Sequence, residues 1–405
     1  MTIHVTGGFY YERCIRPSWD EAYGSGGRAA VVIATCGSDV VFHTYTSDNS
    51  AKHLQMYTHM FGKLTTHTAS IDKAVSFYYL HDLGDPQIDH VPTTPSAPLQ
   101  VRGKHVVRFG MLEGDAIVDA DWAVYDPQNQ GAPVPFDANG SKAKHLALVL
   151  NSWEARQMAA LTEGSAQQCA EKIAREQNAE VVIIKQGAQG ALVWTASGTS
   201  QVPAYRTANV WKIGSGDCFV AYFAQAWMED GLAPALAADR ASRATAYYCE
   251  TQGFATLQQI EHAKHAPIMC KTIEQSANKM VYLAGPFFHL GQIWIIEQAR
   301  TLLKSAGLNV FSPFHDIGLG SASDVVQKDI DAIKKCDLMF AIADGLDPGT
   351  IFEIGYARSI NKPVVIYSEL HSGEEALKMM DGTACDIYQN FTTSIYATRW
   401  KAVET

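Results

Sequence analysis

The stretch from residue 347 to 357, Asp-Pro-Gly-Thr-Ile-Phe-Glu-Ile-Gly-Tyr-Ala, places one glutamate, Glu353, among apolar and small residues. Asp347 suits a helix N-cap, and Pro348 suits the first helical turn, where its missing N–H does no harm. A glutamate held in apolar surroundings is unfavourable unless its chemistry is used. We therefore predict a helix over 348–360 that presents Glu353 as a reactive group.

A second candidate lies where Ile213-Gly-Ser-Gly-Asp-Cys-Phe219 leads into an apolar helix. Glycines at a helix start let backbone N–H groups approach an anion, and the helix dipole favours negative charge there. Gly214 and Gly216 would form such an anion site, and Asp217 beside them is placed to take a proton from an attacking hydroxyl. The motif indicates phosphoryl transfer, but alone it is a weak signal. Other motifs in the same part of the chain are needed to support this interpretation.

The elements that must position Glu353 alternate between strands and helices, which is typical of a parallel sheet covered by helices. They are strand 280–284, helix 292–306, strand 309–312, helix 322–335, strand 337–343, helix 348–360 and strand 363–367. The first three strands end at Gly285-Pro286, at Phe311-Ser-Pro-Phe314 and at Ala343-Asp344. Doubly wound sheets bind ligands beyond the carboxyl ends of their strands, so these ends should share one crevice.

Helix 322–335 should contribute a second carboxylate to this crevice. Val326, Ile330 and Ile333 have helical spacing and form its predicted buried stripe, with Asp329 at the edge of that stripe.

The first 262 residues contain a longer alternating series. Predicted strands are 30–35, 40–45, 105–109, 123–125, 146–150, 181–185 and 191–195, and predicted helices are 165–177 and 217–229. After Phe254 the pattern weakens, and 262–279 is polar with one proline. We predict two α/β domains, 1–262 and 280–405, joined by a linker over 263–279.

Composition excludes several classes of protein. The chain has 405 residues, of which 47% are apolar and 18% charged, as in folded globular proteins of two or three domains. A net charge of −10 argues against nonspecific binding to nucleic acid or an anionic membrane. No apolar run approaches the roughly 20 residues that span a bilayer, and the N-terminus lacks a secretion signal, so we expect a cytoplasmic protein. Eight scattered cysteines without a Cys-x-x-Cys pair fit reduced thiols, and we expect no metal site among them.

Three motifs in the second half resemble the nucleoside 2-deoxyribosyltransferases and related N-glycosidases over about 280–390. They are Tyr282-Leu-Ala-Gly-Pro-Phe-Phe288, Asp329-Ile-Asp-Ala-Ile-Lys-Lys-Cys-Asp337 and Asp344-Gly-Leu-Asp-Pro-Gly-Thr-Ile-Phe-Glu-Ile-Gly-Tyr-Ala357. The resemblance implies a flavodoxin-like, doubly wound parallel sheet. It also implies a retaining displacement at an anomeric carbon, which needs one ionised carboxylate as nucleophile and one acid beside the leaving group.

The same resemblance implies a role for each residue. Glu353 would attack the anomeric carbon, and Tyr282 would hold and tune that carboxylate. Asp329 would contact the base and assist its protonation, and Asp347 would hold sugar hydroxyls. The implied substrate-binding residues are Gly285, Pro286, Phe287, Phe288, Asp344 and Gly349. Plain capping, surface or core roles remain open for Asp347, Asp329, Tyr282, Phe287 and Phe288.

One departure concerns the 5′ end of the sugar. The family often supplies an Asn there from a neighbouring subunit, whereas this chain has Ala376-Leu-Lys-Met-Met-Asp381 in the comparable stretch. The 5′ group, nucleoside or 5′-nucleotide, and the acceptor, a second base or water, therefore stay open. Because related sites borrow residues across an interface, we expect a homo-oligomer.

The first half resembles the PfkB, or ribokinase-like, sugar and nucleoside kinases over about 1–262. Besides the glycine-rich helix mouth, the resemblance rests on Gly26-Gly27 before a small-residue run, Asn151-Ser-Trp-Glu154 after a strand, and Lys185-Gln-Gly-Ala-Gln-Gly190 between two strands. It implies a ribokinase-like α/β sandwich that uses ATP and Mg²⁺. By this resemblance Asp217 would be the catalytic base, and Gly214 and Gly216 would form the anion hole. Asn151 and Glu154 would order magnesium and phosphate. Gly187 and Gly190 would lie on the ATP side, and Gly26 and Gly27 would contact the sugar.

Two departures keep a second interpretation of this half open. Trp211-Lys212 stands where the family usually has Asp-Thr, and only Glu12 or Asp20 is available for the family's sugar-binding Asp. The first domain is therefore either an active kinase or a degenerate domain that binds a ligand or serves as a scaffold.

Together these features predict an enzyme that cleaves or exchanges the N-glycosidic bond of a nucleoside or nucleotide without a cofactor, with ATP and Mg²⁺ assigned to the first domain. One alternative keeps the second fold but takes a dinucleotide such as NAD as substrate, because its nicotinamide is also bonded to an anomeric carbon. Another alternative is a nucleotide sensor in which the first domain binds a metabolite and gates the second.

Overall fold

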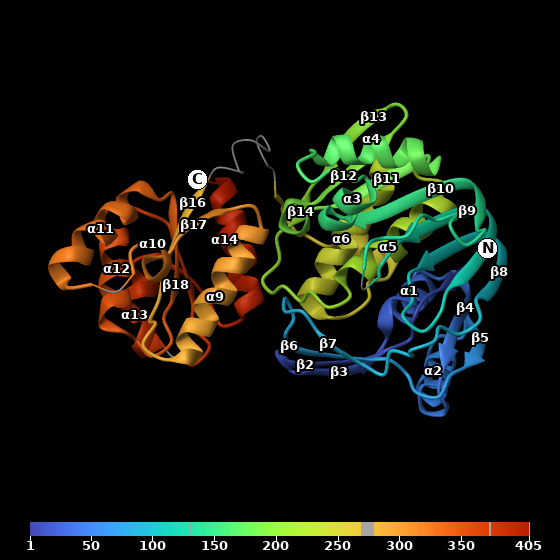
Figure 1. The fold of residues 1–405 in the computed structure, drawn as a ribbon, viewed down its shortest axis with the longest axis horizontal. Helices are drawn as coiled ribbons and strands as arrows, with labels where there is room; N and C mark the ends of the chain where they lie inside the picture. The colour runs from blue at the N-terminus through green and yellow to red at the C-terminus, as the bar shows by residue number, and fades with distance from the viewer. Residues whose placement is uncertain (130, 269–278, 319, 372–373, 405) are drawn as a thin grey trace. The chain divides into compact units, whose positions relative to one another are not determined.

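The computed structural model describes residues 1–129, 131–268, 279–318, 320–371 and 374–404 (Figure 1). The chain divides into two compact units. Unit 1 comprises Met1–Thr207 and Trp211–Pro267, and unit 2 comprises Ala208–Val210 and Ile268–Thr405. The domain boundaries at 262 and 280 stay predictions, because most of the predicted linker lies outside the described residues.

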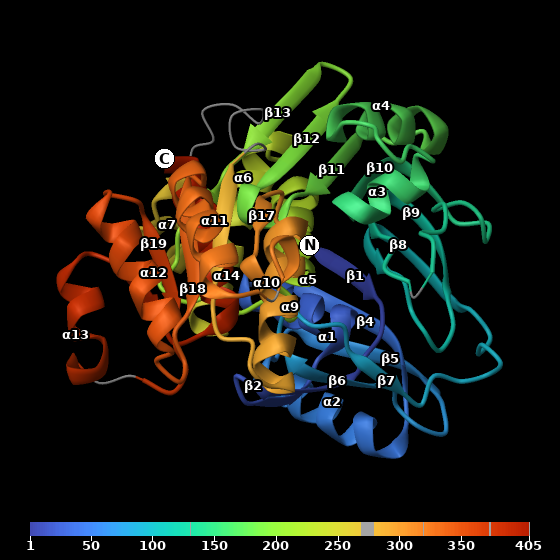
Figure 2. The ribbon, with the colours of Figure 1, turned by 60° about the vertical axis from the view of Figure 1, so that its left-hand side comes forward.

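Unit 1 is built on a nine-stranded sheet of order β13-β12-β11-β10-β9-β8-β1-β4-β5. The strands β11, β12 and β13 pair antiparallel and form one edge of the sheet, seen clearly in Figure 2, while the remaining pairs are parallel. The strand bounds are β1 (Thr2–Thr6), β4 (Asp39–Thr46), β5 (Leu64–Ser70), β8 (Leu99–Phe109), β9 (Ala116–Asp126), β10 (Lys142–Asn151), β11 (Val181–Lys185), β12 (Ala191–Thr195) and β13 (Gly198–Val202).

Helices cover both faces of this sheet because its central strands are apolar on both sides. Val181 and Ile183 of β11 belong to the core that includes α1, α5 and α6, whereas Val182 and Ile184 belong to the core that includes α3 and α4. The helices of unit 1 are α1 (Gly24–Thr35), α2 (Asp48–Met60), α3 (Ser152–Met158), α4 (Ala166–Gln177), η1 (Gly187–Gln189), α5 (Ser215–Ala224), the π-helical turn η2 (Gln225–Glu229), α6 (Pro234–Thr251) and α7 (Leu257–His262).

A separate four-stranded sheet has the order β3-β2-β6-β7. Its strands are β2 (Tyr11–Arg16), β3 (Trp19–Ala22), β6 (Ser76–His81) and β7 (Gln87–Asp89), and a two-stranded sheet pairs β14 (Ala204–Tyr205) with β15 (Pro267–Ile268). Glu12 lies on β2 of this small sheet.

Three local predictions are wrong. Residues 30–35 were expected to form a strand but lie in α1, whose residues Ala29–Ile33 are all buried. A helix that is apolar on every side has no detectable period, so a buried strand and a buried helix look alike in sequence. The predicted helix over 217–229 changes to a π-helical turn at Gln225. Val326 was expected in the buried stripe of its helix but is 49% exposed.

Unit 2 is a five-stranded, all-parallel sheet of order β17-β16-β18-β19-β20. Numbered along the chain this order is 2-1-3-4-5, the flavodoxin-like arrangement. Its strands are β16 (Met280–Ala284), β17 (Asn309–Phe311), β18 (Leu338–Ile342), β19 (Val364–Tyr367) and β20 (Asp386–Tyr388). Its helices are α9 (Leu290–Ser305), α10 (Pro313–Asp316), α11 (Ala322–Lys335), α12 (Pro348–Ser359), α13 (Glu374–Gly382) and α14 (Phe391–Glu404).

The helices of unit 2 also divide between the two faces of the sheet. Tyr282 and Ala284 of β16 share a core with α11, α12 and α13. Helix α9 packs against β17 and β16, α14 packs against β19 and β20, and these two helices contact each other. Across the described ranges of the whole chain, no helix combines the length and apolar character needed to cross a membrane.

Candidate functional site

In unit 2 the candidate site lies at the topological switch point of the sheet. The chain leaves β16 toward β17 on one side and enters β18 on the other, so the switch point lies at the carboxyl ends of β16 and β18, where such sheets bind ligands. Gly285 and Pro286 follow β16, and Ala343 and Asp344 follow β18.

A short hydrogen bond joins the two central residues of this site. Tyr282 is fully buried on β16, and its hydroxyl donates to Oε1 of Glu353 on α12 at 2.6 Å. Burial raises the pKa of Glu353 from 4.5 to about 7, and the Tyr282 hydrogen bond opposes this shift because it favours the charged form. Burial, followed by the charge of Glu353, raises the pKa of Tyr282, which therefore remains a hydrogen-bond donor. Glu353 can thus change its ionisation near neutral pH.

Two further carboxylates act on Glu353. The charges of Asp329 on α11 and Asp347 at the N-cap of α12 both raise the pKa of Glu353, so both lie close enough to repel it. Burial raises the pKa of Asp329 itself, and its buried Oδ1 has no hydrogen-bond partner among the described residues. An unpaired, partly desolvated carboxyl oxygen is suited to a donor on a ligand, or to holding a proton.

Asp347 begins α12 as the sequence predicts. Its Oδ2 accepts from the N–H of Thr350 at 2.8 Å and from the Thr350 hydroxyl at 3.0 Å. A β-carbon on Gly349 would lie 3.1 Å from that same oxygen, so the glycine gives the cap room. Capping accounts for Oδ2, and a ligand role for Asp347 therefore depends on its other oxygen.

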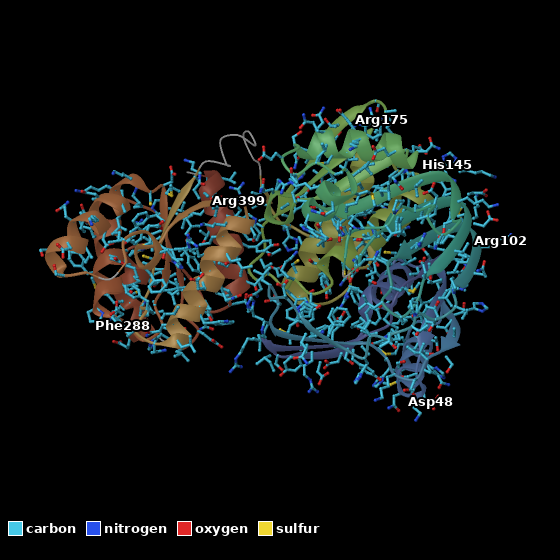
Figure 3. All side chains as sticks on the ribbon, in the orientation of Figure 1. Asp48, Arg102, His145, Arg175, Phe288 and Arg399 are labelled. Atoms are coloured by element: carbon cyan, nitrogen blue, oxygen red, sulfur yellow. The ribbon has the colours of Figure 1, made fainter. Side chains whose placement is uncertain are left out.

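The aromatic residues after β16 form an apolar group near the switch point. The rings of Phe287 and Phe288 lie 5.9 Å apart, and Phe287 is 5.3 Å from Phe314. Phe288, labelled in Figure 3, is 74% exposed, whereas Pro286 is buried. An exposed aromatic ring that follows the carboxyl end of β16 offers a surface on which a base or sugar can pack.

Two of the predicted substrate-binding residues, Asp344 and Gly285, have close partners within the protein. Asp344 Oδ1 accepts from the Ser368 hydroxyl at 3.0 Å and the Leu370 N–H at 2.9 Å, and its Oδ2 accepts from the Glu369 N–H at 3.1 Å. Asp344 therefore holds the loop after β19. A β-carbon on Gly285 would lie 3.2 Å from the Ile342 β-carbon, so this glycine allows β16 and β18 to pack closely where they end.

Sequence reasoning missed a polar pair near the end of β17. His315 Nε2 lies 2.5 Å from Oε1 of Glu297 on α9, and His315 Nδ1 lies 3.0 Å from the Ser312 hydroxyl. The available signal was position, because His315 directly follows the strand end Phe311–Phe314 that the sequence analysis did select.

In unit 1 the predicted base Asp217 lies in a buried ion network. Arg28 Nη1 donates to Asp217 Oδ2 at 2.8 Å, and Arg28 Nη2 donates to Oε2 of Glu12. The other oxygen of Asp217 accepts from Gln128 Nε2 at 2.7 Å. Sequence reasoning did not select Arg28 or Gln128.

The remaining kinase-like residues gather near the ends of β9, β10 and β11. Lys185 Nζ lies 2.6 Å from Oδ2 of Asp126, and burial raises the pKa of Asp126 although Lys185 opposes the shift. Asn151 caps α3: its side-chain oxygen accepts the N–H of Trp153 and of Glu154, each at 2.9 Å. Glu154 Oε2 accepts the Asn151 N–H at 2.7 Å, which completes a capping box.

The predicted ligand-contacting glycines of unit 1 have close protein neighbours. A β-carbon on Gly26 would lie 2.7 Å from the Gly7 backbone, and one on Gly27 would lie 2.6 Å from the Phe9 ring. A β-carbon on Gly190 would lie 2.0 Å from the Val202 carbonyl oxygen. Gly187 has a φ of 56°, which favours glycine. Packing or backbone conformation thus accounts for each of these glycines.

Comparison with known protein families gives a match for each unit. Residues 281–380 match the nucleoside 2-deoxyribosyltransferase model, and residues 128–260 match the pfkB family carbohydrate kinase model. Each match spans less than half of the chain. Among curated proteins, none matches significantly.

Solved structures resemble the ribokinase-like part. Aminoimidazole riboside kinase from Salmonella enterica, complexed with aminoimidazole riboside and an ATP analog, has a TM-score of 0.51 at 16% identity and covers 65% of this chain and 99% of its own. The nucleoside kinase of Burkholderia thailandensis in complex with inosine has a TM-score of 0.49 at 17% identity, covering 64% and 95%. The nucleoside kinase of Methanocaldococcus jannaschii has a TM-score of 0.49 at 13% identity, and the match covers 64% of this chain and 97% of that kinase.

At these identities the likeness concerns the fold alone, and of these three structures the Salmonella enzyme has a TM-score above 0.5. The fold and the family matches agree on the two parts of the chain. This protein combines a ribokinase-like α/β unit that matches the pfkB family carbohydrate kinases with an all-parallel α/β unit that matches the nucleoside 2-deoxyribosyltransferases.

Proposed function

We propose that unit 2 cleaves or exchanges the N-glycosidic bond of a nucleoside or nucleotide, with Glu353 as the nucleophile. The observation that carries this proposal is the 2.6 Å hydrogen bond from Tyr282 to Glu353, because it fixes one carboxylate oxygen at the switch point of the sheet. The match of residues 281–380 to the deoxyribosyltransferase model supports the same reaction class.

The proposed first step forms one bond and breaks one. A carboxylate oxygen of Glu353 bonds to the anomeric carbon while the bond from that carbon to the base nitrogen breaks, and its electron pair stays with the base. A proton held by Asp329, whose pKa burial raises, neutralises the departing nitrogen. The product is a glycosyl ester on Glu353 and a free base.

The second step releases the sugar. A second base or a water molecule attacks the anomeric carbon, the ester bond to Glu353 breaks, and Asp329 takes up the proton of the attacking group. Asp347 is proposed to hold sugar hydroxyls, and Phe287 and Phe288 are proposed to pack against the base or sugar. A base as acceptor makes the enzyme a transferase, and water makes it a hydrolase.

Three classes of substrate can be tested for this site. Nucleosides, 5′-nucleotides and NAD all carry a base-like group on an anomeric carbon, so purified protein should be incubated with all three, with and without ATP, and the products identified by mass. Base release from one of the three would show that the protein is an enzyme and would identify its substrate class. Binding without base release would support the nucleotide-sensor alternative. Light scattering tests the proposed homo-oligomer.

A substitution at Glu353 tests the nucleophile. Glu353→Gln keeps the size and a hydrogen-bond acceptor for Tyr282 but loses the charge, so base release should fall by at least about 10³-fold while the fold persists. Glu375→Gln is the matched control, because Glu375 is an exposed residue of α13. A 2-fluoro-2-deoxy sugar substrate should add the mass of the sugar to the peptide that contains Glu353. Wild-type base release by the Gln variant would refute the assignment.

A further inference from the structure

Arg28 of α1 lies at the centre of the kinase-like part of unit 1. Its side chain has no exposed surface and donates to Glu12, to Asp217 and, at 3.3 Å, to the Gly24 carbonyl. The three charged residues come from three separate elements: Glu12 from β2 of the four-stranded sheet, Arg28 from α1 and Asp217 from α5. A buried guanidinium with two carboxylate partners fastens these elements together.

The two oxygens of Asp217 already accept hydrogen bonds. Oδ2 accepts from Arg28 at 2.8 Å and Oδ1 from Gln128 at 2.7 Å. A general base needs an oxygen within hydrogen-bond reach of the hydroxyl it deprotonates, and it must then hold the proton. Arg28 is fully buried and holds Asp217 through a charge-assisted hydrogen bond, so two protein side chains, Arg28 and Gln128, already engage this carboxylate.

Arg28 also accounts for Gly214. A β-carbon on Gly214 would lie 2.0 Å from Arg28 Cζ and 2.1 Å from its Nε, and the φ of Gly214 is 75°. The guanidinium therefore occupies the space that Gly214 leaves open. On Gly216, a β-carbon would lie 3.4 Å from Lys185 Nζ. The N-terminal end of α5 thus faces two positively charged side chains, Arg28 and Lys185.

The residues predicted to order magnesium are likewise engaged. Asn151 and Glu154 satisfy each other and the first N–H groups of α3 in a capping box, which explains both residue types without a metal. The two side chains predicted to order magnesium and phosphate are thus already hydrogen-bonded within the protein.

We infer that Glu12, Arg28 and Asp217 form a structural ion triad that joins the small sheet, α1 and α5, and that unit 1 does not transfer phosphate through Asp217. Asp217 is a positioning residue of this triad. This inference is independent of the N-glycosidic chemistry proposed for unit 2.

A double-mutant cycle in the full chain tests the triad. Asp217→Asn and Arg28→Met each break a buried pair, and each should lower the melting temperature of the unit 1 transition by about 5–10 °C in calorimetry. The double variant should lose clearly less than the sum of the two shifts, because the residues act through each other. Asp121→Asn is the control, because its carboxylate pairs with Lys144 on the surface and should change melting by at most about 2 °C.

Glu12→Gln and Arg28→Lys complete the test if the first variants fail to fold, since Glu12→Gln keeps the shape of the side chain and Arg28→Lys keeps the positive charge. Phosphoryl transfer from ATP to a panel of sugars and nucleosides is measured on the same preparations, separately from base release. Transfer by the wild type that is lost in Asp217→Asn would overturn the inference and make Asp217 the catalytic base. Unchanged melting of Asp217→Asn would also overturn it, whatever unit 2 does.

Discussion

Removal of the Tyr282 hydroxyl should move the pH dependence of base release. The hydroxyl donates to Glu353 at 2.6 Å and opposes the effect of burial, which raises the pKa of Glu353 to about 7. A hydrogen bond to a charged group is worth about 1.5–3 kcal/mol, and about 1.4 kcal/mol corresponds to one pKa unit. Tyr282→Phe should therefore raise the pKa of Glu353 by a further one to two units, approximately.

The sign follows from the form of Glu353 that reacts. Only the ionised carboxylate is a nucleophile, so wild-type kcat/KM should rise with pH through about 7. In Tyr282→Phe this rise should occur at higher pH, and kcat/KM at pH 6 should fall by about 10- to 100-fold relative to wild type, with a smaller loss at pH 9. When Asp329 is ionised, its charge raises the pKa of Glu353, so Asp329→Asn should shift the rise in kcat/KM to lower pH, even though its overall rate falls because the proton donor is lost.

The assay is base release followed from pH 5 to 9 for the wild type, both variants and Tyr356→Phe. The last variant removes a hydroxyl from the same helix, α12, one turn beyond Glu353, and should leave the profile in place. Profiles that coincide for Tyr282→Phe and the wild type, or a Tyr282→Phe profile displaced to lower pH, would show that this hydrogen bond does not tune the nucleophile.

Four further predictions concern stability. The folded state keeps the Glu353 proton up to about pH 7, whereas the unfolded state releases it near 4.5, so the free energy of unfolding falls as pH rises through this window. In denaturant titrations, Glu353→Gln should therefore raise the free energy of unfolding at pH 8 by up to about 3 kcal/mol and should give no gain near pH 4.5. Burial, followed by the charges of His4 and His67, lowers the pKa of His43 to about 4, so unit 1 should lose stability as pH falls from 6.5 to 4; His43→Phe should lose less, by up to about 3 kcal/mol. Gly214→Ala should lower the melting temperature by several degrees because Arg28 fills the space for a β-carbon, whereas Gly62→Ala, which meets nothing within 4 Å, should not. Asp344→Ala should speed amide hydrogen exchange at Glu369 and Leu370, whose N–H groups it accepts, and unchanged exchange would contradict its loop-holding role.

Much of unit 2 follows from local sequence pattern. The predicted strand 280–284 has the bounds of β16, and the predicted helix 322–335 has the bounds of α11. The N-cap Asp347 and Pro348 begin α12 where expected, because capping depends on residues within one turn. Apolar alternation and turn residues are local signals, so the sequence alone predicts these elements and their fold class.

The same reasoning fails where burial removes the signal. Helix α1 was predicted as a strand over 30–35 because its apolar residues have no polar face to reveal a helical period. Asp344 carried a motif assignment as a substrate-binding residue, yet its carboxylate binds three groups of a loop 24 to 26 residues away along the chain.

The sequence by itself determined which residues of this protein are able to do chemistry and on which elements they lie, because residue type and periodicity are local properties. Only the tertiary structure determined their partners. Tyr282 reaches Glu353 across 71 positions, and Arg28 reaches Asp217 across 189. Glu353, buried beside a tyrosine, can ionise near neutral pH, whereas Asp217 is held by a buried guanidinium that comes from a distant helix. The physical reason is that the environment of an ionisable group depends on charges and burial that packing brings together from distant segments.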